Sequence, residues 1–385
     1  MPPFTDDDVI EPFIPPLSME KSELSPERLL VPAGAPYSLV PPPFMLRPNE
    51  YDQPVIPDEA DYESSDVEPS PFYILKMYRF RPRRGDWKHI SSRGSLDADD
   101  DDPMIKPLPS SVRIITWNVD IIENVWQGRI NGILRHLQEV IDSHDRGRSE
   151  RYRGDAVVVL LQEITPMMLD VIRTDDWVRR TFAIVPLRED KWPRQACRGN
   201  ITLVSRDLEV VKTQIVHFRT TDAQRTGLLV YVQLSATGKT EDKRTICIAN
   251  THLESLPSSE RKRARQLEAL AQLLKLDGDI EGGLIAGDMN PVGKMDCLLP
   301  CNLGLDDAWQ RGDSDPEGFT WGYQSSGEDK KYPPARLDKI LYVPKRRYSV
   351  DEPQRIGVGL KVAVTEEKYW VSGHYGLLTS LRMVG

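Results

Sequence analysis

The chain has 385 residues, 39% of them apolar, and is therefore long enough to bury at least one large hydrophobic core. Its formal charge of −9 is unevenly spread, because 21 acidic and 11 basic residues precede Ser111, whereas the remainder holds 38 acidic and 39 basic residues. The acidic balance belongs to the N-terminal part and does not exclude an anionic substrate for the rest. The sequence has no run of about 18 apolar residues and no signal-peptide pattern at its N-terminus, so we expect a soluble, intracellular protein.

The cysteine pattern predicts neither a disulfide framework nor a zinc site. The 4 cysteines show no disulfide framework in their spacing. Cys297 and Cys301 are closely spaced but lack a second pair of ligands nearby, so zinc is not expected.

Residues 1–70 form an acidic, proline-rich leader that is not expected to pack. Of the 31 prolines, 20 precede Ser111, interleaved with acidic residues and serines. Such a segment cannot bury enough apolar surface to offset the entropy lost on ordering. We expect a disordered, solvated tail. An alternative for Val9 and Ile10, beside three aspartates, is a short motif that docks a protein partner by strand addition.

Residues 71–110 predict a hairpin extension followed by an acidic linker. The segment 72–80 is aromatic and partly alternating, and an arginine-rich turn at 81–86 leads to Trp87. This pattern predicts a hairpin packed on the body. The arginines of the turn suit either a nucleic-acid contact or a solvated turn. Four consecutive aspartates at 99–102 mark the linker.

The body, 111–385, alternates strands and helices. Continuous β-branched runs such as 156–161 are typical of strands buried on both faces. Apolar residues at helical spacing predict helices at 129–143 and 259–276. The other strands are expected at 112–116, 200–205, 209–218, 228–234, 245–249, 284–286, 339–343 and 376–381. This mixture predicts an α+β fold in which two mixed sheets pack face to face between helices, a four-layer α/β/β/α sandwich.

Polar side chains follow the ends of successive predicted strands. The motifs are Thr-Trp-Asn-Val-Asp at 116–120, Leu-Gln-Glu at 161–163, Asn-Thr-His-Leu-Glu-Ser at 250–255, Gly-Asp-Met-Asn at 287–290, Arg-Leu-Asp at 336–338 and Ser-Gly-His at 372–374. Each motif alone suits a capped strand, a core histidine or a surface ion pair equally well. Together they would crowd carboxylates at one rim, which a divalent cation makes tolerable. Oxygen ligands in small number suit Mg²⁺, with Mn²⁺ as the alternative.

In their order and spacing these six motifs resemble the endonuclease/exonuclease/phosphatase superfamily over 111–385. Within it, the segments 116–120, 252–255 and 374–378 look most like the 5′-tyrosyl-DNA phosphodiesterases, as does Phe-Thr-Trp at 319–321. The resemblance implies that Glu163 ligates Mg²⁺ directly, that Asp120 assists through water, and that Asn118 holds a phosphate oxygen.

The same resemblance assigns the remaining chemistry. Asp288, positioned by Asn290, would orient and activate the attacking water, although an ordinary aspartate pKa near 4 would make it a weak base. His252 and His374 would stabilise the charge that builds on the phosphoryl oxygens. Asp338 would pair with His374 and select its tautomer.

Two further positions bear on the substrate and one on the metal. Trp321 is expected to stack on a base or sugar, with core packing as the alternative, and Arg225 to face the phosphate or the tyrosine ring, with a surface ion pair as the alternative. The family usually has Ser-Asp-His where this chain has Ser-Gly-His, so Gly373 replaces a carboxylate that normally lies near the metal. We therefore expect weaker Mg²⁺ dependence than in relatives with the full motif.

Three functions remain open on the sequence. The first is an Mg²⁺-dependent phosphodiesterase that removes a tyrosyl or peptide adduct left by a type II topoisomerase from a DNA 5′ end, in the nucleus and also in the cytoplasm. The near-neutral body favours a short single-stranded end over extended duplex. The second is another activity on this fold: an abasic-site endonuclease, a 3′-exonuclease or deadenylase, or a phosphatase acting on a small or lipid phosphate. The third is a catalytically silent binding module, because Gly373 departs from the motif and the leader offers a docking segment. None of the three involves a membrane.

Overall fold

The structure, a computed structural model, describes residues 70–90, 107–120, 125–145, 156–276, 278–324 and 332–385. The leader before Ser70 and the acidic linker at 99–102 lie outside these residues, so both expectations stay predictions. Within the described part, no helix is both long and apolar enough to cross a membrane.

Most strands of the described chain form two large mixed sheets. One sheet has 7 strands in the order β1 (Phe72–Ile74), β8 (Val210–His217), β9 (Thr226–Ser235), β10 (Lys243–His252), β11 (Gly282–Asp288), β13 (Asp338–Tyr342) and β12 (Asp306–Asp307). The other has 9 strands: β14 (Tyr348–Val350), β18 (Gly376–Met383), β4 (Ser111–Asn118), β5 (Ala156–Ile164), β7 (Gly199–Ser205), β6 (Phe182–Val185), β2 (Tyr78–Arg81) and β3 (Asp86–His89), with β15 (Gln354–Ile356) pairing on β18. A separate hairpin pairs β16 (Lys361–Val364) with β17 (Glu367–Trp370).

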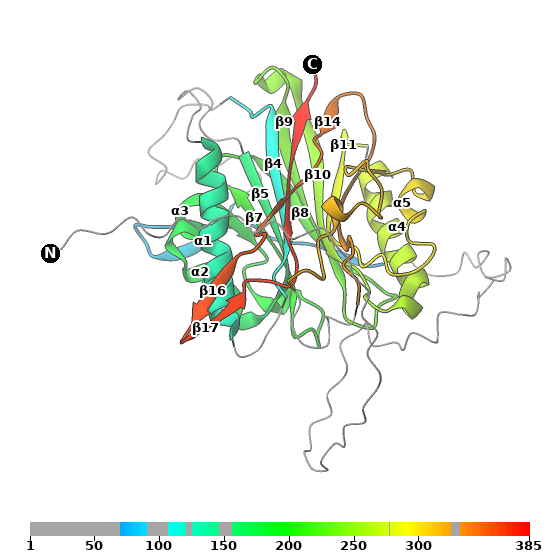
Figure 1. Ribbon diagram of the computed structural model, residues 1–385. Coiled ribbons are helices and arrows are strands. Elements are labelled where there is room, and N and C mark those ends of the chain that lie inside the picture. Colours follow the sequence, from blue (N-terminus) through cyan, green and yellow to red (C-terminus); the bar gives the residue numbers. More distant parts are fainter. Residues whose placement is uncertain (1–69, 91–106, 121–124, 146–155, 277, 325–331) are drawn as a thin grey trace, which may run out of the picture. The chain divides into compact units, whose positions relative to one another are not determined.

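The two sheets face each other, and helices cover their outer faces (Figure 1). The 9-stranded sheet is covered by α1 (Trp126–Asp145), α2 (Pro166–Thr174) and α3 (Asp176–Thr181); the other carries α4 (Glu260–Leu276) and the short α5 (Leu299–Asn302). One apolar cluster lies between the sheets and includes Ile114 and Val230, both 0% exposed. Two further clusters lie between each sheet and its helices. The four-layer sandwich predicted from the sequence is confirmed.

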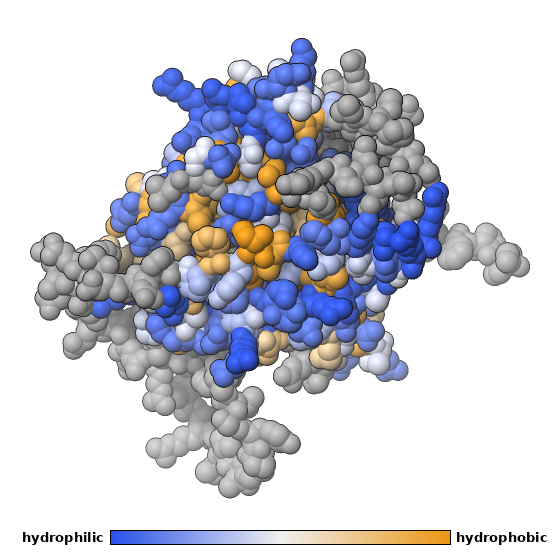
Figure 2. Space-filling model, turned by 180° about the vertical axis from the view of Figure 1, so that it is seen from behind, coloured by the Kyte–Doolittle hydropathy of each residue, from blue (hydrophilic) through white to orange (hydrophobic). Residues whose placement is uncertain are grey.

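Residues 71–90 contribute strands to both sheets. The predicted hairpin is present as β2 and β3, and β2 pairs with β6, whereas β1 pairs with β8 of the opposite sheet. Met77 and Phe80 are buried, but all three side chains of β1 are exposed, so the aromatic run packs only in its second half. Residues 71–90 thus join the sandwich, with the predicted hairpin packed on the body. On the face seen in Figure 2, apolar side chains form small groups among polar ones.

The predicted helices and long strands are present with small shifts at their ends. Helix α1 begins at Trp126, before the predicted start at 129, and α4 follows a short 3-10 turn, Pro257–Ser259. The sequence did not predict α2, α3, β6 or the short strands β14 to β17. These segments are 3 to 9 residues long, too short for a periodic pattern to stand out.

Candidate active site

Strand register brings the polar strand ends to one rim of the sandwich. Parallel pairing of β10 with β11 sets His252 opposite Asp288, and antiparallel pairing of β11 with β13 sets Asp288 opposite Asp338. From the other sheet, Asn118 at the end of β4 donates its Nδ2 hydrogen to Asp288 Oδ2 at 2.9 Å. Residues 170 positions apart in the sequence are thus joined across the two sheets.

Asp288 is the centre of this cluster. Besides Asn118, its Oδ2 lies 3.2 Å from His252 Nε2, and its Oδ1 accepts the backbone N–H of Asn290 at 3.1 Å. Burial, followed by the nearby Asp338 carboxylate, raises the pKa of Asp288 to about 6. The ordinary pKa near 4 assumed from the sequence was wrong, because the sequence pattern did not reveal how deeply this carboxyl group is buried. A carboxylate with a pKa near 6 is a competent general base at neutral pH.

Asn290 positions Asp288 through its main chain rather than through its side chain. It has a left-handed backbone, with φ of 45°, which turns its N–H back to Asp288. Its amide Nδ2 donates instead to the carbonyl of Leu253 at 3.1 Å and so ties the exit of β10 to that of β11. Met289, between the two, packs in the core as expected for an alternating strand end.

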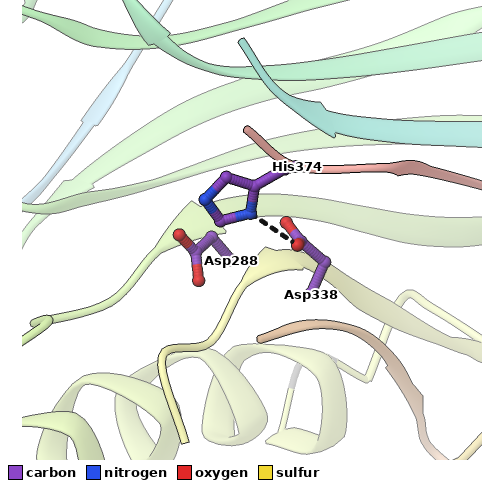
Figure 3. A group of neighbouring side chains, drawn as sticks. All are labelled: Asp288, Asp338 and His374. Carbon is purple, nitrogen blue, oxygen red and sulfur yellow. Dashed lines mark hydrogen bonds and ion pairs between the residues drawn. The ribbon is translucent and has the colours of Figure 1, made fainter. Parts of the chain in front are cut away.

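The predicted pair of His374 and Asp338 is present (Figure 3), with Nδ1 and Oδ2 2.8 Å apart. Burial alone would lower the pKa of His374, but the carboxylates of Asp338, Asp288 and Asp120 outweigh it and raise the pKa to about 10. His374 is therefore an imidazolium at neutral pH. The Trp117 indole donates to its carbonyl at 3.0 Å and so holds the main chain that carries the ring.

His252 has the opposite character. Burial and the neighbouring guanidiniums of Arg225 and Arg198 hold its pKa well below the usual range, so the ring is neutral. Arg225 Nη1 donates to Nδ1 at 2.8 Å. Because a guanidinium can only donate, Nδ1 carries no proton and Nε2–H faces Asp288. The rim thus combines one cationic and one neutral histidine on either side of a buried carboxylate.

The two carboxylates predicted to hold the metal are both paired with arginines. Glu163 Oε2 accepts from Arg198 Nη1 at 2.8 Å, and Asp120 Oδ2 accepts from Arg129 Nη2 at 3.0 Å and from the N–H of Gly373 at 3.0 Å. Burial would raise the pKa of Asp120, but Arg129 and then His374 lower it below the usual value. Both acidic residues have left-handed backbones, with φ of 61° and 48°, a strain that functional sites often retain.

The donor set fits a hard divalent cation at Glu163 but not at the tightest cluster. Among the described residues, Asp288, Asp338 and His374 have ligand atoms within 4.8 Å of one another. In that cluster His374 Nδ1 is already hydrogen-bonded to Asp338 Oδ2 at 2.8 Å, so the three residues form a charge-coupled triad. Glu163 has a partly exposed carboxylate, which suits Mg²⁺. The fit requires Arg198 to move, and Oδ2 of Asp120 is already engaged.

Other predicted residues take up positions near the rim. Arg225 is 7% exposed, and its guanidinium contacts His252 rather than a surface partner. Trp321 is 8% exposed, and its backbone bridges to Ala335 and His374. The stacking role of Trp321, the substrate contact of Arg225 and the phosphate contact of Asn118 stay predictions. Asn118 keeps a second Nδ2 hydrogen besides the one given to Asp288.

Sequence reasoning missed four residues that organise the site. These are Arg129, Arg198, Gln162 and Asn250. Asn250 donates to the carbonyl of Ile201 at 2.8 Å and accepts from Gln162 Nε2 at 2.8 Å, which links the sheets directly beneath the rim. Gln162 and Asn250 belong to the motifs at 161–163 and 250–255. A polar residue within an otherwise apolar strand was the signal that could have identified them. No local sequence pattern identified Arg129 or Arg198 as the partner of a carboxylate.

No family model matches this chain. The chain has two mixed sheets packed face to face between helices, which is the fold of the endonuclease/exonuclease/phosphatase superfamily. Within it, the chain is similar to tyrosyl-DNA phosphodiesterase 2 (TDP2), as the sequence motifs predicted. The protein of that name from Gallus gallus is 26% identical over 184 residues, which cover 47% of this chain and 42% of the relative. The match thus spans less than half of that protein.

Solved TDP2 structures share the fold at low identity. A humanized D. rerio TDP2 aligns with a TM-score of 0.53 at 20% identity, covering 71% of this chain and 99% of the other. TDP2 from C. elegans aligns with a TM-score of 0.52 at 19% identity, covering 72% and 77%. D. rerio TDP2 complexed with a single-strand DNA product aligns with a TM-score of 0.53 at 19% identity, covering 71% and 99%. At this identity the structures support the fold.

Proposed function

We propose that this chain is a divalent-cation-dependent phosphodiesterase that hydrolyses the bond between a tyrosine and the 5′-phosphate of a DNA end. The observation that carries the proposal is the placement of Asp288 between the neutral His252 and the cationic His374. A base, a neutral donor and a cation around one point are what in-line displacement at phosphorus requires. The similarity to TDP2, together with a D. rerio TDP2 that holds a single-strand DNA product, supports a single-stranded DNA end as substrate.

Asp288 orients the attacking water and accepts its proton. Its two oxygens are held by Asn118, by His252 and by the backbone of Asn290, so the carboxylate is fixed before substrate arrives. With a pKa of about 6 it is mostly ionised at pH 7 to 8. The water oxygen bonds to phosphorus, the bond from phosphorus to the tyrosyl oxygen breaks, and a 5′-phosphate remains.

The two histidines stabilise the charge that develops. His374, positively charged because of Asp338, stabilises the phosphoryl oxygens and the departing phenolate, whose free pKa is also about 10. His252 donates from Nε2 without adding charge. A cation bound by Glu163, with Asp120 acting through water, would neutralise the non-bridging phosphate oxygens. Mg²⁺ is the proposed ion, and Mn²⁺ the alternative.

The decisive test uses a 5′-phosphotyrosyl oligonucleotide with Mg²⁺, with EDTA, and with the Asp288→Asn variant. We expect Mg²⁺-dependent release of tyrosine that falls by about 10²- to 10⁴-fold in the variant, the usual contribution of a general base. Abasic duplex and 3′-recessed DNA are run alongside. Cleavage of only these two substrates would indicate an abasic-site endonuclease or an exonuclease instead. No turnover of any substrate by folded protein would support the silent binding module instead.

DNA repair at ends blocked by type II topoisomerase remnants, and a nuclear location, follow from this substrate and belong to the same proposal. The near-neutral charge of 111–385 supports a short single-stranded end rather than extended duplex. Docking of a protein partner through the leader is proposed from its sequence alone.

A further inference from the structure

The two carboxylates on the metal side of the rim are balanced by two arginines that differ in freedom. Arg129 has a side chain only 1% exposed, and its Nε also donates to the carbonyl of Val371 at 2.8 Å. Its Nε and Nη2 are thus both bonded, to the main chain and to Asp120. Arg198 has a side chain 37% exposed, and among the described residues its guanidinium bonds to Glu163. Of the two cations, Arg198 is the one that can leave.

The backbone that carries Arg198 is fixed even though its guanidinium is exposed. The next residue, Gly199, begins β7, and a Cβ there would lie 2.3 Å from the Trp192 indole. Trp192 in turn donates to the carbonyl of Asn200 at 3.3 Å. The tight contact between Gly199 and the indole sets where the Arg198 side chain begins. Its aliphatic stem can therefore swing about a fixed point, so that the guanidinium pairs with Glu163 or turns to solvent.

Gly373 removes a competing negative charge from the same place. A Cβ at this position would lie 2.7 Å from Asp120 Oδ2, and the glycine N–H instead donates to that oxygen. Two carboxylates and two guanidiniums then sum to no net charge. A divalent cation bound to this carboxylate would lie beside the like charge of Arg198, which already occupies Oε2, so the two cations compete for Glu163.

We propose that Arg198 competes with a divalent cation for Glu163, so that the guanidinium holds the carboxylate until the cation displaces it. The inference rests on the proposed cation at Glu163, but not on the choice of substrate. Arg198 is thus a residue that sets the metal affinity of the site. An ion pair exposed to this extent stabilises by up to about 1 kcal/mol, so its removal should tighten cation binding by about fivefold.

The experiment measures Mn²⁺ binding to the full chain by electron paramagnetic resonance, which detects free Mn²⁺ without any turnover. Arg198→Gln is compared with wild type and with Arg194→Gln, an exposed arginine on the same segment. A double variant, Arg198→Gln with Glu163→Gln, gives the background from other acidic residues. We expect Arg198→Gln to bind Mn²⁺ about fivefold more tightly, Arg194→Gln to match wild type, and the double variant to lose the gained site.

Equal Mn²⁺ affinity in wild type and Arg198→Gln overturns the competition, as does a gain that survives Glu163→Gln. Arg198→Lys serves as a second variant, because it keeps the charge but loses the planar fork, and its affinity should fall between the other two. The tyrosine-release assay is read separately. Hydrolysis that needs Mg²⁺ with unchanged Mn²⁺ affinity overturns this inference and leaves the function intact. Tighter Mn²⁺ binding without hydrolysis overturns the function and leaves the competition intact.

Discussion

Arg225 Nη1 donates to His252 Nδ1 across 2.8 Å, and this bond decides which nitrogen of the ring carries the proton. The arginine lies just before β9 and the histidine ends β10, so antiparallel pairing of these strands brings them together. Arg225 is 7% exposed and cannot accept a hydrogen bond. His252 therefore presents Nε2–H to Asp288 in the folded protein.

Replacing Arg225 should remove the hydrogen bond that fixes the tautomer of His252. In Arg225→Met the Nδ1 atom loses its donor, and we expect turnover to fall by about 10²-fold, the usual cost of one misdirected donor in such a site. Arg225→Lys keeps a donor and should retain most of the activity. Nitrogen-15 spectra of the histidine ring report the tautomer directly. An unchanged ring spectrum in Arg225→Met would mean that His252 is held by something else.

The stability of the protein should depend on pH through Asp288. Its folded pKa of about 6 lies above the unfolded value of 3.8, so the folded state binds this proton more tightly. The free energy of unfolding therefore falls as pH rises from about 4 to 6, by up to about 3 kcal/mol at 1.4 kcal/mol per unit. Asp288→Asn cannot titrate and should lose this slope. Urea unfolding of both proteins at pH 4, 5, 6 and 7 gives the comparison, and parallel curves would contradict it.

Restoring the family carboxylate should alter metal dependence at a cost in metal-free stability. In Gly373→Asp the new side chain must push Asp120 Oδ2 from its place, since the Cβ alone would come within 2.7 Å. A third carboxylate then favours a cation. We expect a stronger Mg²⁺ dependence of turnover and a loss of about 1–3 kcal/mol without metal.

Gly373→Asn is the matched control, because it has nearly the same size without the charge. It should share the loss of stability but not the gain in Mg²⁺ dependence. If Gly373→Asp leaves both the Mg²⁺ titration and the rate as in wild type, the glycine is not what distinguishes this site.

Asn250 should be needed to hold the two sheets together under the rim. Asn250→Ala removes the side-chain donor to the buried carbonyl of Ile201 and one of the acceptors of Gln162 Nε2, which keeps Thr116 and Leu160. We expect a loss of about 2–3 kcal/mol in the free energy of unfolding. Gln272→Ala, at an exposed position on α4, should change it by less than about 0.5 kcal/mol. Equal unfolding curves for the two variants would remove Asn250 from this role.

The sequence by itself determined the four-layer sandwich and the rim on which the site lies. Both depend on local pattern: apolar runs predict buried strands, and a polar residue directly after such a run must emerge at a strand end. The pairing of Asp338 with His374 was expected only because the family resemblance implies it, and the structure contains it. Short elements such as α3, with 6 residues, were not predicted because fewer than two turns of helix carry too little periodicity.

Only the tertiary structure decided the charge states and partners within the site. His252 and His374 occupy similar sequence contexts, yet one is neutral beside Arg225 and the other is an imidazolium beside Asp338. Glu163 meets a guanidinium from 35 residues away, and Asn118 meets Asp288 from 170 residues away. Burial and Coulomb interactions act through space over a few ångströms, whereas a sequence pattern records only neighbours along the chain.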